Sequence, residues 1–360
     1  KVATTQRVNN PVFEDEFDVR VIRHLVTSPD EKTLVFSAVG YLWTMDVASK
    51  RVSRLTKATH FEFEPTFNPA GTKLAYVSWD DTELGAVHLR DLASGSEQKL
   101  TTEPGIYRTP AFSPDGKMIV YRKDDGNGHQ GYVHCTEPGL YIVPSAGGEA
   151  ELVTPKGEYP VFSADGERIF FQTGGFLFGS LTKGFYSIKT NGSDEKKHFD
   201  GKYAQRFSIS PDNNWIAWSE LYKVYIAPFP KTGKTMGINA STKAVPVAQV
   251  AKDAGINIHW SPDSKRLYWT LGNEYYSDEL TERFSFLEGA ADSIPPMDSL
   301  GMSIPLTLPM DQPEGLLAFT NARLITMEGD EVIANGTIIV EGNTIKSLGA
   351  SDQVRVPRNA

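Results

Sequence analysis

Hydrophobic and polar positions repeat along the chain in one fixed pattern around a short turn. The turn has the form Ser-Pro-Asp-Gly or a close variant, and its six copies are spaced by 40, 45, 50, 47 and 51 residues. Proline presets φ at the second turn position, while Asp and Gly suit the third and fourth. A period of this size is typical of a propeller, a solenoid or another repeat array. The copies begin at Ser28, Asn68, Ser113, Ser163, Ser210 and Ser261.

The residues that follow each turn keep one register. Five positions past the second turn residue stands Leu or Ile, and seven positions past it stands an aromatic residue. A spacing of two places both on the same face of a strand. Each repeat therefore predicts a strand, a tight turn and an antiparallel strand with a buried aromatic ring. These rings belong to Phe36, Tyr76, Tyr121, Phe171, Trp218 and Trp269.

Two further short strands follow in most repeats, for example at 41–45 and 52–55 in the first. Six units of four strands without helical periodicity predict an all-β chain that forms a six-bladed β-propeller over residues 1–286. The sixth unit lacks a strand, and an open ring would leave an exposed sheet edge. We expect residues 3–8 to supply that outer strand, so that both ends of the propeller meet in one blade.

The turn and the alternating apolar and aromatic residues after it resemble the repeat of TolB-like propellers, a WD40-like arrangement. The resemblance covers roughly residues 18–284. It is specific for the fold, whereas propellers support many different activities. We expect a periplasmic or secreted protein.

A different pattern follows the propeller. Residues 287–315 are expected to form a Pro-rich linker, because Pro295, Pro296, Pro305, Pro309 and Pro313 fall close together. Strands resume at 317–320, 322–326, 336–340 and 344–348, with a tight hairpin at Glu341-Gly342-Asn343. Residues 316–360 are therefore predicted to form a small, partial β-sandwich.

The strings at 319–326 and 335–345 resemble the opening β-sandwich strands of metal-dependent amidohydrolases. This resemblance implies a following (β/α)₈ barrel that holds a zinc-type divalent metal through a His-X-His motif. The chain has no His-X-His and no histidine beyond His259. It is thus expected to be the non-catalytic propeller and sandwich portion of a truncated hydrolase of amide or cyclic amide C–N bonds. Alone it should be inactive and free of metal or cofactor, its partner being the barrel in cis.

The alternative is a stand-alone propeller that binds a peptide or protein partner with its channel mouth or its loops. The candidate contact is the long loop that carries Asp124, Asp125, His129 and His134, which could meet a partner or a lid. These residues include donors for a metal, but their spacing matches no zinc pattern and Cys135 is the only cysteine. We therefore interpret the loop as a contact loop and predict no metal, catalytic or cofactor site.

Composition excludes several other classes. The net charge is −9 and no basic run reaches five residues, which argues against nucleic-acid binding. No apolar stretch approaches 18 residues, so no membrane span is expected. No Gly-X-Ser-X-Gly nucleophile motif occurs.

His259, Trp260, Trp218 and Trp269 could form a ligand cage, but their repetition from unit to unit favours the core. The pair Asp80-Asp81 follows a strand and is expected to cap a loop.

Overall fold

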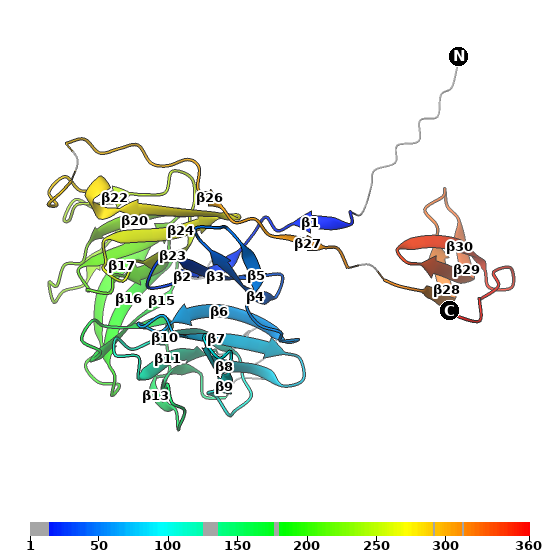
Figure 1. The fold of residues 1–360 in the computed structure, drawn as a ribbon, viewed down its shortest axis with the longest axis horizontal. Helices are drawn as coiled ribbons and strands as arrows, with labels where there is room; N and C mark the ends of the chain where they lie inside the picture. The colour runs from blue at the N-terminus through cyan, green and yellow to red at the C-terminus, as the bar shows by residue number, and fades with distance from the viewer. Residues whose placement is uncertain (1–13, 125–135, 176–179, 291, 312) are drawn as a thin grey trace, which may run out of the picture. The chain divides into compact units, whose positions relative to one another are not determined.

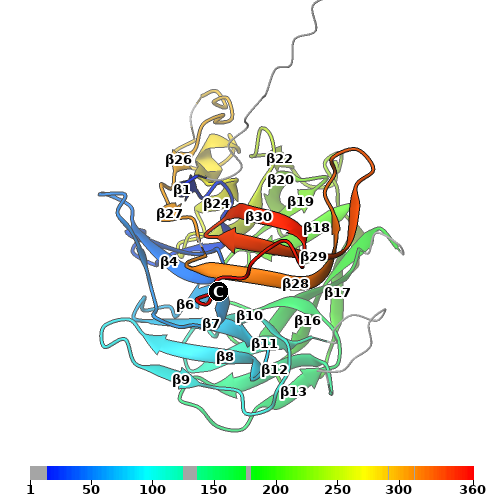
Figure 2. The same cartoon turned by 90° about the vertical axis from the view of Figure 1, so that its right-hand side faces the viewer.

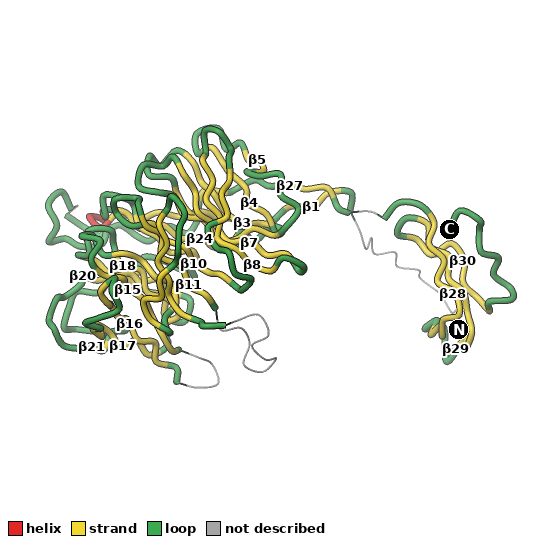
Figure 3. Tube along the Cα trace, turned by 90° about the horizontal axis from the view of Figure 1, so that it is seen from below, coloured by secondary structure: helices red, strands yellow, loops and turns green. Residues whose placement is uncertain are grey.

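The computed structural model describes residues 14–124, 136–175, 180–290, 292–311 and 313–360. This part of the chain is almost entirely β-structure, and the single helix in it is the short 3-10 turn η1 (Leu280–Glu282; Figure 3). It divides into two compact units, Val19–Leu306 and a second unit that combines the residues up to Asp18 with Thr307–Ala360. The all-β expectation is confirmed.

The unit Val19–Leu306 consists of six antiparallel sheets in chain order, with the last beside the first (Figures 1 and 2). Each sheet has four consecutive strands except where noted below, so the six predicted blades are confirmed. The blades are β2–β5 (Arg23–Thr27, Thr33–Ala38, Tyr41–Asp46, Val52–Arg54), β6–β9 (Phe61–Phe67, Lys73–Asp80, Leu84–Asp91, Glu97–Lys99), β10–β13 (Tyr107–Phe112, Met118–Lys123, Gly139–Pro144, Glu151–Thr154), β14–β17 (Glu158–Phe162, Arg168–Gly174, Thr182–Lys189, Lys196–Lys202), β18–β20 with β22 (Ala204–Ile209, Trp215–Glu220, Lys223–Pro228, Ala248–Gln249) and β23–β26 (Ile256–Trp260, Arg266–Leu271, Glu274–Glu279, Met302–Ser303).

The repeated turn is closed by its own side chains. In the third blade, Ser113 Oγ donates to Asp115 Oδ1 at 2.6 Å and accepts the N–H of Met118 at 2.9 Å. The hydroxyl of Ser113, followed by the N–H of Lys117, lowers the pKa of Asp115. The same serine-to-strand bond recurs in the other Ser turns, and Asn68 Oδ1 replaces it in the second blade. The turn therefore forms from residues within one short segment.

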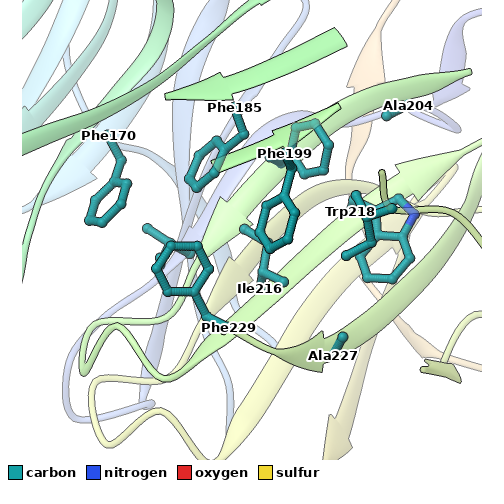
Figure 4. Packing of buried hydrophobic residues seen from close by; sticks show 11 residues of the cluster. Phe170, Phe185, Phe199, Ala204, Ile216, Trp218, Ala227 and Phe229 are labelled. Atoms are coloured by element: carbon teal, nitrogen blue, oxygen red, sulfur yellow. The ribbon is translucent and has the colours of Figure 1, made fainter. Parts of the chain in front are cut away.

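The six predicted aromatic rings are buried, each at most 3% exposed, which confirms the register. Further aromatic side chains pack against these six rings in the space between neighbouring blades. Between the fourth and fifth blades, Trp218 lies in a cluster with Phe170, Phe185, Phe199 and Phe229 (Figure 4). Aromatic rings at such spacings contribute packing energy beyond their burial, so this cluster stabilises the contact between the fourth and fifth blades.

The outer strand of the sixth blade differs from the prediction. It is β26, which pairs with β25 at Tyr275–Met302 and comes from the segment expected to be a linker. The propeller therefore runs past residue 286 to Leu306, whose carbonyl accepts the N–H of Val19 at 2.8 Å. The segment 3–8, to which we assigned this role, lies outside the described residues.

Polar side chains also join the first and last blades. Thr27 Oγ1 is 2.9 Å from His259 Nε2 and 2.9 Å from the hydroxyl of Tyr275. Arg266 Nη1 donates to Glu31 Oε2 at 2.8 Å. These contacts span more than 230 residues of sequence, so they hold the ring shut in addition to the strand pairing.

Blade four carries one extra strand. The segment between β20 and β22 crosses back, and its strand β21 (Met236–Gly237) pairs in parallel with β17. The insertion covers the edge of blade four, which would otherwise be open. The sequence pattern gave no sign of it because the strand is only two residues long.

The second unit holds two sheets. β1 (Glu16–Asp18) pairs with β27 (Thr307–Pro309), and β28 (Leu316–Ile325), β29 (Val332–Glu341) and β30 (Thr344–Ala350) form an antiparallel three-stranded sheet. The hairpin at Glu341-Gly342-Asn343 joins β29 and β30 as predicted. The described residues provide one layer here, where a partial sandwich was expected. The two strands predicted within 317–326 are one strand, interrupted by register shifts around Ala322.

Candidate functional site

The innermost strand of every blade contains a bulge at an equivalent position. The first strands of successive blades are neighbours around the axis, and each shifts register against its second strand. Five positions before the second turn residue, five blades place a polar side chain within this bulge, and the fifth blade places one directly after it. We call these six residues the channel ring: His24, Glu64, Thr109, Tyr159, Arg206 and Asn257.

The backbone of the channel ring is strained. In five blades the ring residue has a φ between 47° and 55°, a region that non-glycine residues rarely adopt. In the fifth blade the extra residue is Gln205, and Arg206 pairs with Ser219. Repeated left-handed residues at one level of the fold mark a candidate functional site, because such strain persists where the surroundings enforce it.

Glu64 links three blades within the ring. Its side chain is 6% exposed. Oε1 accepts hydrogen bonds from Arg108 Nε at 2.8 Å and Nη2 at 2.6 Å, and Oε2 accepts the N–H of Thr109 at 2.5 Å. His24 Nε2 lies 3.8 Å from Oε1. The charge of Glu64 is therefore matched by that of Arg108, and both are fixed in place.

His24 is a neutral member of the ring. Its backbone N–H donates to Asn257 Oδ1 at 2.8 Å, and its Nδ1 lies 3.2 Å from Ser37 Oγ. Burial lowers the pKa of His24 to about 4; Glu64 opposes this shift, whereas Arg108, Arg206 and Arg23 add to it. The imidazole therefore carries no charge at pH 7.

Arg206 has no carboxylate within ion-pair distance among the described residues, and the charge of Glu64 acts on it from farther away. Its guanidinium carbon lies 4.5 Å from the centre of the Tyr159 ring, a cation–π contact. Its Nε is buried without a hydrogen-bond partner, and no ion pair involves Arg206 among the residues described. Burial lowers the pKa of Arg206 below its usual range. Thr109 Oγ1, in the same ring, is also buried without a partner.

A cavity of about 380 Å³ opens beside the ring. Its walls come from the first three blades, and they combine apolar rings with the polar group around Glu64. Pockets of this size with few polar groups are typical of ligand sites. The wall residues include His24, Phe63, Glu64, Trp79, Tyr107 and Arg108.

The propeller surface at this end is rich in exposed apolar side chains. We call it the mouth face: first strands begin there, second strands end there, and the loops between second and third strands project from it. Nine large apolar residues of the described chain are exposed on it by 37–63%, from five of the six blades. They are Val21, Val39, Phe61, Leu181, Tyr203, Leu221, Tyr222, Ile256 and Leu271.

The predicted contact loop leaves blade three on the mouth face. Asp124 directly follows β11; its N–H donates to the carbonyl of Ile106 at 2.8 Å, and its Oδ1 lies 3.3 Å from Arg122 Nη2. Asp125, His129 and His134 lie outside the described residues, as does Cys135. The structure thus places the start of this loop beside the channel and leaves its role as a prediction.

The other residues weighed from sequence have structural roles. Trp218 and Trp269 are buried core residues. His259 contacts Thr27 and the carbonyl of Asn257, and Trp260 Nε1 donates to the carbonyl of Ser208. Asp80 accepts the N–H groups of the loop residues that follow it, as a cap does.

The described residues contain neither a metal-ligand cluster nor a long apolar helix. No three His, Cys, Asp or Glu side chains gather there in a way that could hold a metal ion. No helix there has the length and apolar content needed to cross a membrane. The donor set that a zinc-type centre requires is therefore not found in this part of the chain.

The channel ring was missed by sequence reasoning. Its members share a position but not a residue type, so the repeat consensus does not reveal them. A usable signal existed: every blade is polar at this position, and in three blades a proline follows, at Pro65, Pro110 and Pro160. Asn and His also tolerate positive φ better than most residues.

Comparison with known proteins agrees with this architecture. The family model described as "TolB beta propeller domain" matches residues 27–225. The Tol-Pal system protein TolB of Gluconobacter oxydans is 33% identical over 117 residues, which cover 32% of this chain and 24% of that protein. TolB of Alcanivorax borkumensis is 31% identical over 75 residues, 21% of this chain and 17% of that one. The matches thus span about a quarter or less of these curated relatives.

Among solved structures, a putative TolB from Agrobacterium tumefaciens superimposes with a TM-score of 0.53 at 17% identity. The superposition covers 74% of this chain and 96% of that one. At this identity the likeness concerns the fold alone. Because the family model extends over more than half of the chain and the six blades agree with it, the chain belongs to the TolB beta propeller domain family.

Proposed function

We propose that this chain is a binding propeller that holds a protein or peptide partner on its mouth face, over the channel. The observation that carries the proposal is the concentration of exposed apolar side chains on that face. Monomeric soluble proteins rarely expose large contiguous apolar patches, and such patches mark interaction sites. Leu221 and Tyr222, each 63% exposed, sit together at the tip of one loop.

The channel beneath this face supports the same proposal. Its cavity is polar at the ring and apolar at Phe63 and Trp79, which suits a side chain or a chain end inserted from a bound partner. The curated relatives are named as proteins of the Tol-Pal system rather than as enzymes. We extend to this chain only a role in protein binding, and with it a periplasmic or secreted location.

A displayed library of random peptides, selected on the purified chain, tests the proposal. Selected peptides are then titrated against the wild type, against Tyr222→Asp and against Leu152→Asp. Leu152 is a matched control: it is 50% exposed but lies on the outer strand β13. Loss of an aromatic anchor should weaken binding about tenfold or more. Equal affinities for all three proteins, or equal losses in both variants, would overturn the proposal.

A second candidate function rests on the C-terminal sheet. One face of β28–β30 exposes Leu317, Phe319, Ile345 and Leu348 by 44–56%. Isolated small sheets are marginally stable in water, so this face calls for a cover. We infer that the sheet belongs to an amidohydrolase-type sandwich, with the C–N-hydrolysing, metal-binding barrel encoded beyond residue 360.

The DNA downstream of the Ala360 codon tests this second candidate directly. An open reading frame that encodes His-X-His soon after residue 360 supports the amidohydrolase. A stop codon at that point, or a continuation without histidine pairs, overturns it. Either result leaves the binding proposal standing, because the mouth face belongs to the other compact unit.

A further inference from the structure

We propose that Arg206 anchors a carboxylate of the bound partner in the channel. The inference rests on the proposed binding function and adds the chemistry that the partner must present. Arg206 is a channel-ring residue whose Nε is buried without a partner, and the described chain offers it no ion pair. Burying a charge without compensation is costly, so an arginine with no ion pair among the described residues is a suitable anchor for an anion of a bound partner.

A second arginine in the same channel provides the contrast. Arg108 binds Glu64 through two nitrogens, at 2.8 and 2.6 Å, and its charge is satisfied internally. With His24 neutral, the charges of Glu64 and Arg108 cancel, so the six channel-ring residues together with Arg108 carry one net positive charge, that of Arg206. This excess lies within a protein whose net charge is −9. The local charge at Arg206 therefore favours an anion.

The geometry favours a carboxylate. Tyr159 covers one face of the guanidinium at 4.5 Å, which leaves the N–H edge as the direction for hydrogen bonds. A carboxylate accepts two parallel bonds from that edge, whereas a dianionic phosphate would bring one more charge than the ring can balance. Thr109 Oγ1, buried and unpartnered in the blade next to Tyr159, is a further donor in the ring.

The partner is thus an extended peptide that inserts one carboxylate into the channel while its neighbouring apolar side chains rest on the mouth face. The carboxylate has two sources, an Asp or Glu side chain or the end of a chain. Both present the same planar group to Arg206. Amidation of the peptide terminus and exchange of each acidic residue for its amide distinguish the two sources.

The first experiment needs no variant. A buried Arg Nε–H exchanges slowly with water, so Arg206 should give a resolved signal in ¹⁵N-arginine NMR. Succinate is titrated as the probe, with succinamide and inorganic phosphate in parallel. We expect succinate to shift this signal and succinamide to leave it unmoved. A signal that responds to none of the three, or to phosphate alone, overturns the carboxylate proposal.

The second experiment uses the library peptides. Arg206→Gln should weaken them about tenfold or more, whereas Arg168→Gln should not, because Arg168 pairs with Asp194 at the turn end of blade four. Either amidation of the peptide terminus or exchange of one acidic residue for its amide should reproduce this loss of affinity. If Tyr222→Asp weakens the peptides while Arg206→Gln does not, the anchor is wrong and the binding face stands. If neither substitution weakens the peptides, both proposals are wrong. If Arg206→Gln does not fold, Arg206→Lys takes its place in the titration.

Discussion

Replacing Arg206 by methionine should stabilise the free protein, although a cation–π contact is lost. That contact with Tyr159, at 4.5 Å, contributes about 1 kcal/mol at a partly desolvated site. Holding an unpaired guanidinium with a buried Nε costs several kcal/mol at full burial. Because the side chain is only partly buried, we count roughly half of that penalty. The net gain is about 1–2 kcal/mol, or a rise in Tm of about 2–4 °C for a domain of this size.

Arg108→Met is the matched control, and it should act in the opposite direction. It leaves the carboxylate of Glu64, 6% exposed, without its cation. Breaking a buried pair in this way costs about 3–5 kcal/mol, and the exposure of Arg108 reduces this to about 1–2 kcal/mol. Calorimetry and urea titration at pH 7 measure both variants. If Arg206→Met is destabilised as much as Arg108→Met, Arg206 is a structural residue and our reasoning about the channel fails.

Three further predictions concern packing, pH and chemistry. Trp218→Ala removes a fully buried ring and should lower the free energy of unfolding by about 3–5 kcal/mol in a urea titration, while a loss below about 1 kcal/mol would place the ring outside the core. Stability should fall as the pH drops from about 6.5 to about 4, because the unfolded chain then binds protons on four histidines that stay neutral in the folded protein, where their pKa is near 4. One such histidine accounts for up to about 2 kcal/mol of the free energy of unfolding at pH 5. Identical urea midpoints at pH 7 and pH 5 would contradict this. The purified 360-residue chain should hydrolyse no amide or cyclic amide and should carry no stoichiometric zinc, and elemental analysis that finds one zinc per chain with chelator-sensitive turnover would overturn this. The four histidines are His24, His88, His198 and His259.

The pH prediction has its own control. His198 is on β17 of blade four and is not a channel-ring residue; its Nε2 lies 2.8 Å from Ser187 Oγ on the neighbouring strand β16. His198→Gln should therefore flatten the pH dependence by about one histidine's share without changing the binding of the selected peptides. A variant that keeps the full wild-type slope would show that burial does not hold the pKa of this imidazole down.

The blades were predictable because their determinants are local. The turn closes through bonds such as Ser113 Oγ to Asp115 and Met118, all within six residues. The strand period of two then places Ile119 and Tyr121 on the inner face whatever the rest of the chain does. The hairpin at Glu341-Gly342-Asn343 was predictable for the same reason. The amidohydrolase interpretation of that region rests on resemblance and stays a proposal.

The tertiary structure alone decided how the ring closes and what the channel contains. β26 was hidden in a proline-rich stretch, because a two-residue strand is defined by its partner Tyr275 and not by its own pattern. Likewise, the sequence does not show which of Arg108 and Arg206 pairs with a carboxylate. Arg108 binds Glu64 at a separation of 44 residues, whereas among the described residues Arg206 contacts the face of Tyr159. Whether a buried charge is satisfied depends on groups that meet through folding, and this is why the candidate site emerged from the structure.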